Sequence, residues 1–135
     1  MTFTWSDDLL VGDETIDSQH KQLVDRYNSL VLACVSGKAI AELEIALNFL
    51  ADYTVAHFSY EETLQRELEF ADYPRHKQLH DGFTQTVKDL INQLQDSGAT
   101  LGLTYRLSTR IGNWLINHIK QEDTKVGQLI RSKLV

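Results

Sequence analysis

Hydrophobic residues recur at steps of three and four along four stretches of the chain, with polar residues between them. This spacing is typical of one face of an amphipathic α-helix. The stretches cover residues 18–35, 40–68, 74–95 and 100–118, and short breaks rich in Gly, Ser, Asp and Pro separate them. Because short connections join antiparallel neighbours, the pattern predicts an all-α protein. We expect one domain, residues 1–135, folded as an antiparallel up-down-up-down four-helix bundle.

The two ends of the chain are predicted to add to this bundle. Residues 1–17 indicate an irregular N-terminal arm, and Asp17 or Ser18 is placed to cap the first helix. Residues 126–134 predict a short C-terminal helix that packs Leu129 and Ile130 on the bundle. The arm is anchored by its apolar side chains: Phe3, Trp5, Leu9, Leu10, Val11 and Ile16.

The four predicted buried faces carry polar side chains that a plain hydrophobic core would not need. In chain order they are His20-Leu23-Tyr27-Leu30-Cys34, Leu43-Leu47-Leu50-Thr54-His57-Glu61-Leu64-Leu68, His76-His80-Phe83-Val87-Leu90-Leu94 and Thr104-Leu107-Ile111-Trp114-His118. Cys34 is expected to act as a small buried hydrophobe. The histidines and Glu61 require another explanation.

All five histidines of the chain fall on these faces. A lone histidine on an apolar face is more often a hydrogen-bonded core residue than a ligand, but five buried imidazoles without a common partner would each be desolvated at a cost. Glu61 lies four residues after His57, hence on the same face, and a glutamate is rarely buried unless it is paired or bound to metal. Its alternative partners are arginines that all lie off the buried faces: Arg66, Arg75, Arg106 and Arg110.

Asp123 follows His118 by five residues, about 140° away on a regular helix. Two interpretations remain open from this spacing. Asp123 is a surface residue beside Glu122, or the last turn widens locally and returns the carboxylate to the face of His118.

Imidazole and carboxylate ligands together suit iron, and zinc or manganese would also accept them. The zinc-protease motif HExxH is absent, because the segment from His76 to His80 reads HKQLH. No glutamate precedes a histidine by three residues, so the Glu-x-x-His motif of ferritin-like di-iron proteins is absent too.

Composition narrows the partners. The net charge of −6 argues against nucleic acid and against an anionic membrane surface. A single cysteine cannot form an internal disulfide, the N-terminus has acidic residues where a signal peptide needs basic ones, and no apolar run is long enough for a membrane span. We therefore expect a cytoplasmic protein.

Four blocks of the sequence resemble the hemerythrins, in particular the bacterial single-domain kind. They are VGDETIDSQHKQL around His20, HFSYEE from His57, HKQLH from His76 and WLINHIKQED from Trp114 to Asp123. Their order and spacing match over nearly the whole chain, including the five-residue step to Asp123. In one departure, the commoner EExLM pattern ends here in Gln65 instead of methionine.

The resemblance implies two non-haem irons joined by an oxo or hydroxo bridge. Glu61 and Asp123 would bridge them, with three histidines on one iron (His76, His80 and His118) and two on the other (His20 and His57). One coordination position would remain vacant, on the iron with two histidines. The resemblance further implies that Leu115 covers this position, with Trp114 beside it.

The implied function is reversible dioxygen binding, for storage, delivery to an oxygen-using enzyme, or sensing. No nucleophile is paired with a base on the predicted faces, so we do not expect an enzyme. The alternative is a di-iron enzyme that consumes peroxide or nitric oxide.

Overall fold

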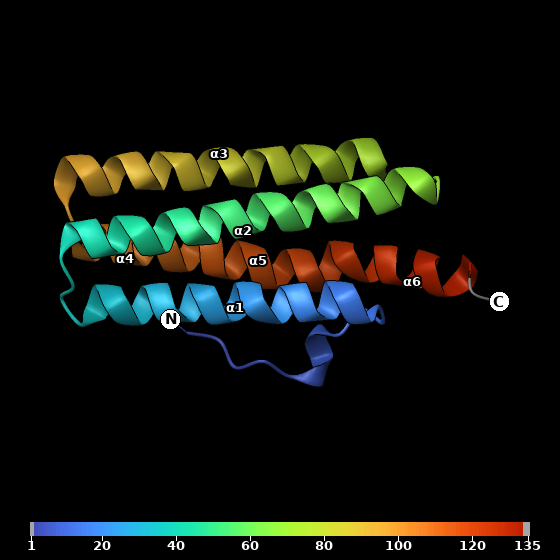
Figure 1. Ribbon diagram of the computed structural model, residues 1–135, viewed down its shortest axis with the longest axis horizontal. Helices are drawn as coiled ribbons and strands as arrows, with labels where there is room; N and C mark the ends of the chain where they lie inside the picture. Colours follow the sequence, from blue (N-terminus) through green and yellow to red (C-terminus); the bar gives the residue numbers. More distant parts are fainter. Residues whose placement is uncertain (1, 134–135) are drawn as a thin grey trace.

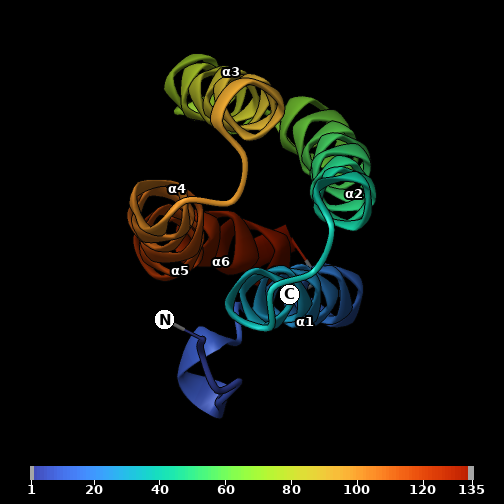
Figure 2. The same ribbon diagram turned by 90° about the vertical axis from the view of Figure 1, so that its left-hand side faces the viewer.

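Four helical columns, each antiparallel to its neighbours, form a bundle in the computed structural model, which describes residues 2–133. Figure 1 shows three long helices, α1 (Glu14–Val35), α2 (Ile40–Glu67) and α3 (Tyr73–Ser97). The fourth column is segmented: α4 (Leu101–Arg106), a π-helix (Leu107–Gly112), α5 (Asn113–His118), a second π-helix (Ile119–Asp123) and α6 (Thr124–Lys133). Helix α1 packs on α2, α2 on α3, and the fourth column closes the ring against α1 and α3 (Figure 2). The predicted four-helix bundle is confirmed.

The helix boundaries follow local sequence signals. Helix α1 begins earlier than expected, because its cap is Asp13, whose carboxylate accepts a hydrogen bond of 3.0 Å from the Ile16 amide. The prediction of Asp17 or Ser18 as the cap was therefore wrong. Pro74 lies in the first turn of α3, where its missing N–H is not needed. Thr100 caps α4 by accepting from the Leu103 amide.

The N-terminal arm is held against α1 and α6. Asp17 accepts hydrogen bonds from the backbone amides of residues 11 and 12, and the Arg131 guanidinium donates to the Val11 carbonyl. A Cβ at Gly127 would lie 1.9 Å from that carbonyl oxygen, so the arm can pass only over a glycine. The prediction that Leu10 anchors the arm was wrong, because Leu10 is 45% exposed, whereas its neighbours Leu9 and Val11 are buried.

Most of the predicted faces form the core, and the departures are informative. Helix α3 buries all six predicted residues, and α2 buries its predicted face from Leu43 to Glu61. Beyond Glu61 the buried face shifts: Leu64 and Leu68 are only half-buried, and Gln65 is buried instead. Alternating steps of four and three average 3.5 residues per turn, whereas a straight helix has 3.6, so the face drifts by about 20° per heptad. Over the 28 residues of α2 this drift is large enough for Gln65, and not the preceding Leu64, to occupy the buried face near the end of the helix.

Two further expectations about burial need correction. Cys34, near the end of α1, is half-buried and not in the core. In the C-terminal helix Ile130 packs partly buried against the core, as predicted, whereas Leu129 is only half-buried and the buried residues are Val126 and Gly127. The helix prediction for residue 134 lies outside the described residues.

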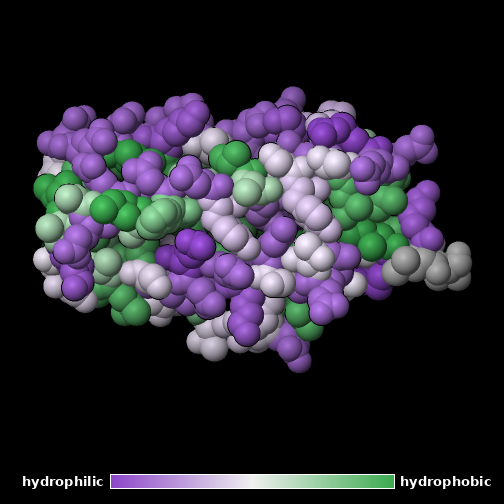
Figure 3. All heavy atoms as spheres, viewed as in Figure 1, coloured by the Kyte–Doolittle hydropathy of each residue, from purple (hydrophilic) through white to green (hydrophobic). Residues whose placement is uncertain are grey.

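The outer surface is mixed. In the view of Figure 3 hydrophilic residues cover much of the molecule, and hydrophobic residues show as separate patches. None of the helices within residues 2–133 combines the length and the apolar character that crossing a membrane requires.

Candidate metal centre

The seven candidate ligands converge inside the bundle. They come from all four columns, and none is more than 5% exposed to solvent: His20, His57, Glu61, His76, His80, His118 and Asp123. The structure thus brings together every metal-site residue singled out from the sequence. The ion pairs of Glu61 within residues 2–133 are all with histidines, which removes the arginine alternative.

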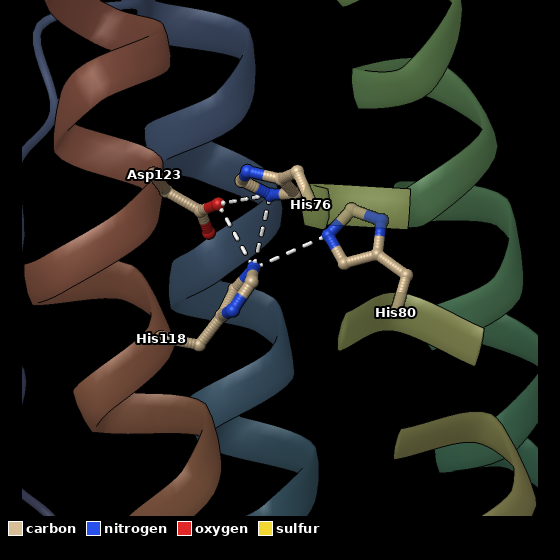
Figure 4. Close-up of side chains that lie close together, drawn as sticks. All are labelled: His76, His80, His118 and Asp123. Atoms are coloured by element: carbon tan, nitrogen blue, oxygen red, sulfur yellow. Dashed lines mark hydrogen bonds and ion pairs between the residues drawn. The ribbon is translucent and has the colours of Figure 1, made fainter. Parts of the chain in front are cut away.

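Three histidines and one carboxylate oxygen form the first cluster (Figure 4). His118 Nε2 lies 3.1 Å from His76 Nε2 and 3.2 Å from His80 Nε2. Asp123 Oδ1 lies 3.1 Å from the Nε2 atoms of both His76 and His118. Four donor atoms from two columns of the bundle therefore surround one point.

Asp123 reaches this cluster because the helix widens. Residues 119–123 form a π-helix, in which hydrogen bonds join residues i and i+5. A five-residue step then returns to nearly the same face, and the side chain of Asp123 points at that of His118 (Figure 4). Of the two interpretations left open from the sequence, the interior position of Asp123 is the one observed. Asp123 is 1% exposed, whereas Glu122 forms surface ion pairs with Arg75 and Lys125.

The second cluster shares Asp123 with the first. Asp123 Oδ2 lies 3.0 Å from His20 Nε2, and Glu61 Oε1 lies 3.7 Å from the same nitrogen. Glu61 Oε2 lies 3.5 Å from His57 Nε2 and 3.7 Å from His80 Nε2, so this carboxylate also faces both clusters. Each cluster offers four donor atoms within 4.8 Å of one another and could hold a metal ion.

The contacts fit metal ligation better than direct hydrogen bonding. Several of the converging atoms are buried yet make no hydrogen bond of normal geometry: His20 Nε2, both Glu61 oxygens and Asp123 Oδ1. They approach one another within ion-pair distance without forming hydrogen bonds of normal geometry. Adjacent donors at about 2.1 Å from one metal in an octahedral arrangement lie about 3.0 Å apart, which is close to the 3.1–3.2 Å separations of His76, His80, His118 and Asp123.

Two histidines are held by partners at their other ring nitrogen. His80 Nδ1 lies 2.8 Å from Glu62 Oε2, and His57 Nδ1 lies 2.7 Å from Gln19 Oε1. An acceptor at Nδ1 places the proton there and leaves the Nε2 lone pair for a metal. Neither partner was predicted from the sequence, although each adjoins a predicted ligand, since Gln19 precedes His20 and Glu62 follows Glu61.

Charge is unevenly distributed among the ligands. Burial by itself would lower the pKa of His20, but the carboxylates of Asp123 and Glu61 outweigh it and raise that pKa to about 10. Burial, and after it the charge of His20, lowers the pKa of His57 to about 3. Burial and the facing histidines lower the pKa of His80 to about 2.

The two carboxyl groups differ from each other as well. Burial and the neighbouring Asp123 raise the pKa of Glu61. Burial would also raise the pKa of Asp123, but the facing histidines hold it well below its usual range.

The two residues expected around an oxygen pocket lie close by. Trp114 is half-buried and stacks on His118, with ring centroids 4.4 Å apart and an interplanar angle of 9°. Trp114 also stacks on Phe83, with ring centroids 4.2 Å apart. Trp114 thus lies at the three-histidine cluster. Leu115, three residues before His118, is 3% exposed.

Known proteins share this sequence and this fold. Residues 11–130 match the family described as Hemerythrin HHE cation binding domain. A bacteriohemerythrin of Pseudomonas aeruginosa is 33% identical over 130 residues, which cover 96% of this chain and 82% of the relative. A hemerythrin-like protein of Naegleria gruberi is 32% identical, over 91% of this chain and 89% of its own length. A wild-type hemerythrin crystal structure superposes with a TM-score of 0.83 at 28% identity, covering 96% of this chain and 98% of the other. The chain belongs to the hemerythrin HHE cation-binding domain family.

Proposed function

We propose that this protein binds dioxygen reversibly at a carboxylate-bridged non-haem di-iron centre, for storage, delivery or sensing. The observation that carries the proposal is the position of Asp123. One of its oxygens faces His76 and His118, and the other faces His20, at 3.0–3.1 Å. A carboxylate placed in this way between two groups of histidines supports a pair of metal ions, and membership of the hemerythrin family supports iron.

The ligands divide between the two irons as the sequence resemblance implies. His76, His80 and His118 would hold one iron, His20 and His57 would hold the other, and Glu61 and Asp123 would be shared between the two. By resemblance to the family, five imidazoles, two shared carboxylates and one oxo or hydroxo oxygen would fill about eleven of about twelve coordination positions. The position left open beside His20 and His57 would be the one available to dioxygen.

When bound, the iron pair supplies the electrons for dioxygen binding, and the chain supplies the surroundings. Gln19 and Glu62 hold the rings of His57 and His80 through Nδ1. Phe58 stacks on His80 with ring centroids 3.7 Å apart and an interplanar angle of 4°, which keeps water from that side of the cluster. The buried side chain of Leu115 excludes water from the oxygen pocket, and Trp114 covers the three-histidine cluster by stacking on His118. Exclusion of water and of protons favours release of dioxygen unchanged.

One observation favours the alternative of a di-iron enzyme that consumes peroxide or nitric oxide. Glu62 touches His80 on one side, and on the other its carboxylate lies 3.6 Å from the ammonium group of Lys77, which is half exposed. Burial raises the pKa of Glu62 despite this ammonium group. Such a chain of groups could move a proton between solvent and the site, which turnover requires and a carrier does not.

Metal analysis and optical spectroscopy test the proposal. Protein loaded with iron under anaerobic conditions should contain about two irons per chain, as the ligand count requires. Admitting air should produce a stable oxygenated spectrum that flushing with argon reverses. About one iron per chain would sink the di-iron assignment. Rapid irreversible oxidation with steady consumption of peroxide or nitric oxide would favour the enzyme.

A further inference from the structure

Gln65 is the buried polar side chain near the metal centre for which the proposed function gives no role. It is 0% exposed, and neither atom of its amide makes a hydrogen bond. Leaving a buried amide unpaired is unfavourable, so its position requires an explanation. Gln65 follows Glu61 by four residues and therefore lies on the same face of α2, one turn further along.

On α1 and α6, the buried residues one turn away from the ligands toward the level of Gln65 are apolar. One turn before His20, α1 contributes Ile16, and three residues after Asp123, α6 contributes Val126; both are 0% exposed. A polar partner for Gln65 must therefore come from the adjacent metal layer. Besides His20 Nε2, which faces the carboxylates of Asp123 and Glu61, two ring nitrogens of that layer are buried and equally without a hydrogen bond, His76 Nδ1 and His20 Nδ1.

The packing of α2 against α3 selects His76. Glu62 on α2 contacts His80 on α3 at 2.8 Å. The two helices are antiparallel, so a step toward the C-terminus on α2 corresponds to a step toward the N-terminus on α3. Gln65, one turn after Glu62, therefore lies opposite His76, one turn before His80. Phe70 supports this register, because its amide donates to the Gln65 carbonyl at 2.9 Å and its ring lies 6.1 Å from that of His76.

The packing of α2 against α1 excludes His20. Gln19 contacts His57 at 2.7 Å, which places His57 opposite the turn that contains His20. Gln65 lies eight residues beyond His57, or about 12 Å along the helix. The amide of Gln65 is therefore beside the start of α1 and out of reach of the His20 ring.

We propose that Gln65 is a positioning residue for the metal centre, with its Oε1 accepting a hydrogen bond from Nδ1–H of His76, through one enclosed water or after a rotation of the Gln65 side chain. This role rests on the proposed function, since it concerns a ligand of the iron pair. It would give His76 the type of partner that Gln19 gives His57 and Glu62 gives His80. The hydrogen bond keeps the proton on Nδ1, directs the Nε2 lone pair to the metal and makes the imidazole a stronger donor.

The substitution Gln65→Met tests this role, because methionine fills nearly the same volume without an acceptor for Nδ1–H. Loss of such a partner typically weakens metal binding by about 10- to 100-fold. We therefore expect at least a tenfold loss of iron(II) affinity, measured anaerobically by competition with a chelator. The melting temperature of the metal-free protein should change little, because methionine fills the space of Gln65 and only one hydrogen bond is lost. A merely structural role would instead lower stability and affinity together.

Gln93→Met is the matched control. Gln93 is a half-buried glutamine whose Oε1 also lacks a hydrogen bond, and it lies on α3 thirteen residues after His80, about 20 Å along the helix. Its substitution should leave iron affinity unchanged. An equal loss of affinity in both variants would overturn the role of Gln65.

Nitrogen-15 NMR of the zinc-loaded protein tests the contact without relying on folding of a variant. The wild type should show a protonated Nδ1 of His76 that exchanges slowly with solvent, and Gln65→Met should accelerate this exchange. Rapid exchange in the wild type, or unchanged affinity in Gln65→Met, overturns the positioning role alone. If the wild-type protein binds no metal at these seven ligands, the proposed function is overturned, and the role of Gln65 with it.

Discussion

Metal binding should release a proton from His20, and the structure sets the size of the effect. The carboxylates of Asp123 and Glu61 raise the pKa of His20 in the metal-free protein to about 10. A histidine must be neutral to bind a metal, so at pH 7 the incoming ion displaces this proton. Because the pKa of His20 lies about three units above pH 7, displacing its proton makes the free energy of metal binding less favourable by about 4 kcal/mol. The same ions would bind correspondingly more tightly at high pH.

The direction of the pH dependence follows from the protonation of each state. Between pH 7 and 10 His20 is protonated in the metal-free protein and neutral in the metal-loaded protein. The affinity for metal should therefore rise about tenfold per pH unit through this histidine. Above pH 10 this contribution disappears. His57 and His80, with pKa values of about 3 and 2, are already neutral and contribute no proton in this range. The raised pKa of Glu61 adds to proton release toward the acid end.

Calorimetric titration with iron(II) in two anaerobic buffers of different ionisation enthalpy counts the protons released. We expect at least one per chain at pH 7.5. The variant Asp123→Asn removes the anion that lies 3.0 Å from His20 Nε2. The number of protons released per iron bound should therefore fall, whether or not the iron affinity of the variant also falls. A wild-type count near zero at pH 7.5, with affinity independent of pH up to 9, would refute the reasoning.

The remaining predictions address the ligands, the pocket and the arm. Asp123→Ala should lose iron or the spectroscopic coupling between the irons, whereas Glu122→Ala beside it should change little; the reverse would mean that the carboxylate has been misassigned by one residue. Protein stripped of iron by a chelator should melt well below the loaded form, because each buried ligand left unpaired costs about 1–3 kcal/mol; equal melting temperatures in scanning calorimetry would argue against buried ligands. Leu115→Ala should lower unfolding free energy by about 2–5 kcal/mol and shorten the lifetime of the oxygenated form severalfold at matched iron loading; an unchanged lifetime would remove this leucine from the oxygen pocket. Gly127→Ala introduces a Cβ 1.9 Å from the Val11 carbonyl oxygen and should lower stability to urea by about 1–3 kcal/mol as the arm is displaced, an expectation that wild-type stability would contradict.

Much of the molecule could be predicted from the sequence because helix geometry is local. Steps of three and four place side chains on one face whatever the helix packs against. The four columns, the position of Pro74 and the burial of all five histidines therefore followed from spacing alone. For the same reason the pairing of His57 with Glu61 needed no knowledge of neighbouring helices.

Other features depended on tertiary structure. A five-residue step to Asp123 is compatible with surface or interior, and only the π-helix at residues 119–123 decides for the interior. A sequence pattern cannot report that widening, because the packing of the fourth column and the contacts of the buried carboxylate select it over a regular helix. The burial of Gln65 in place of Leu64 likewise results from drift accumulated along a straight helix of 28 residues. Gln19 and Glu62 became partners of histidines 38 and 18 residues away because antiparallel packing brought their helices into register. Spacing determines which face a side chain occupies, and packing between helices determines what it meets there.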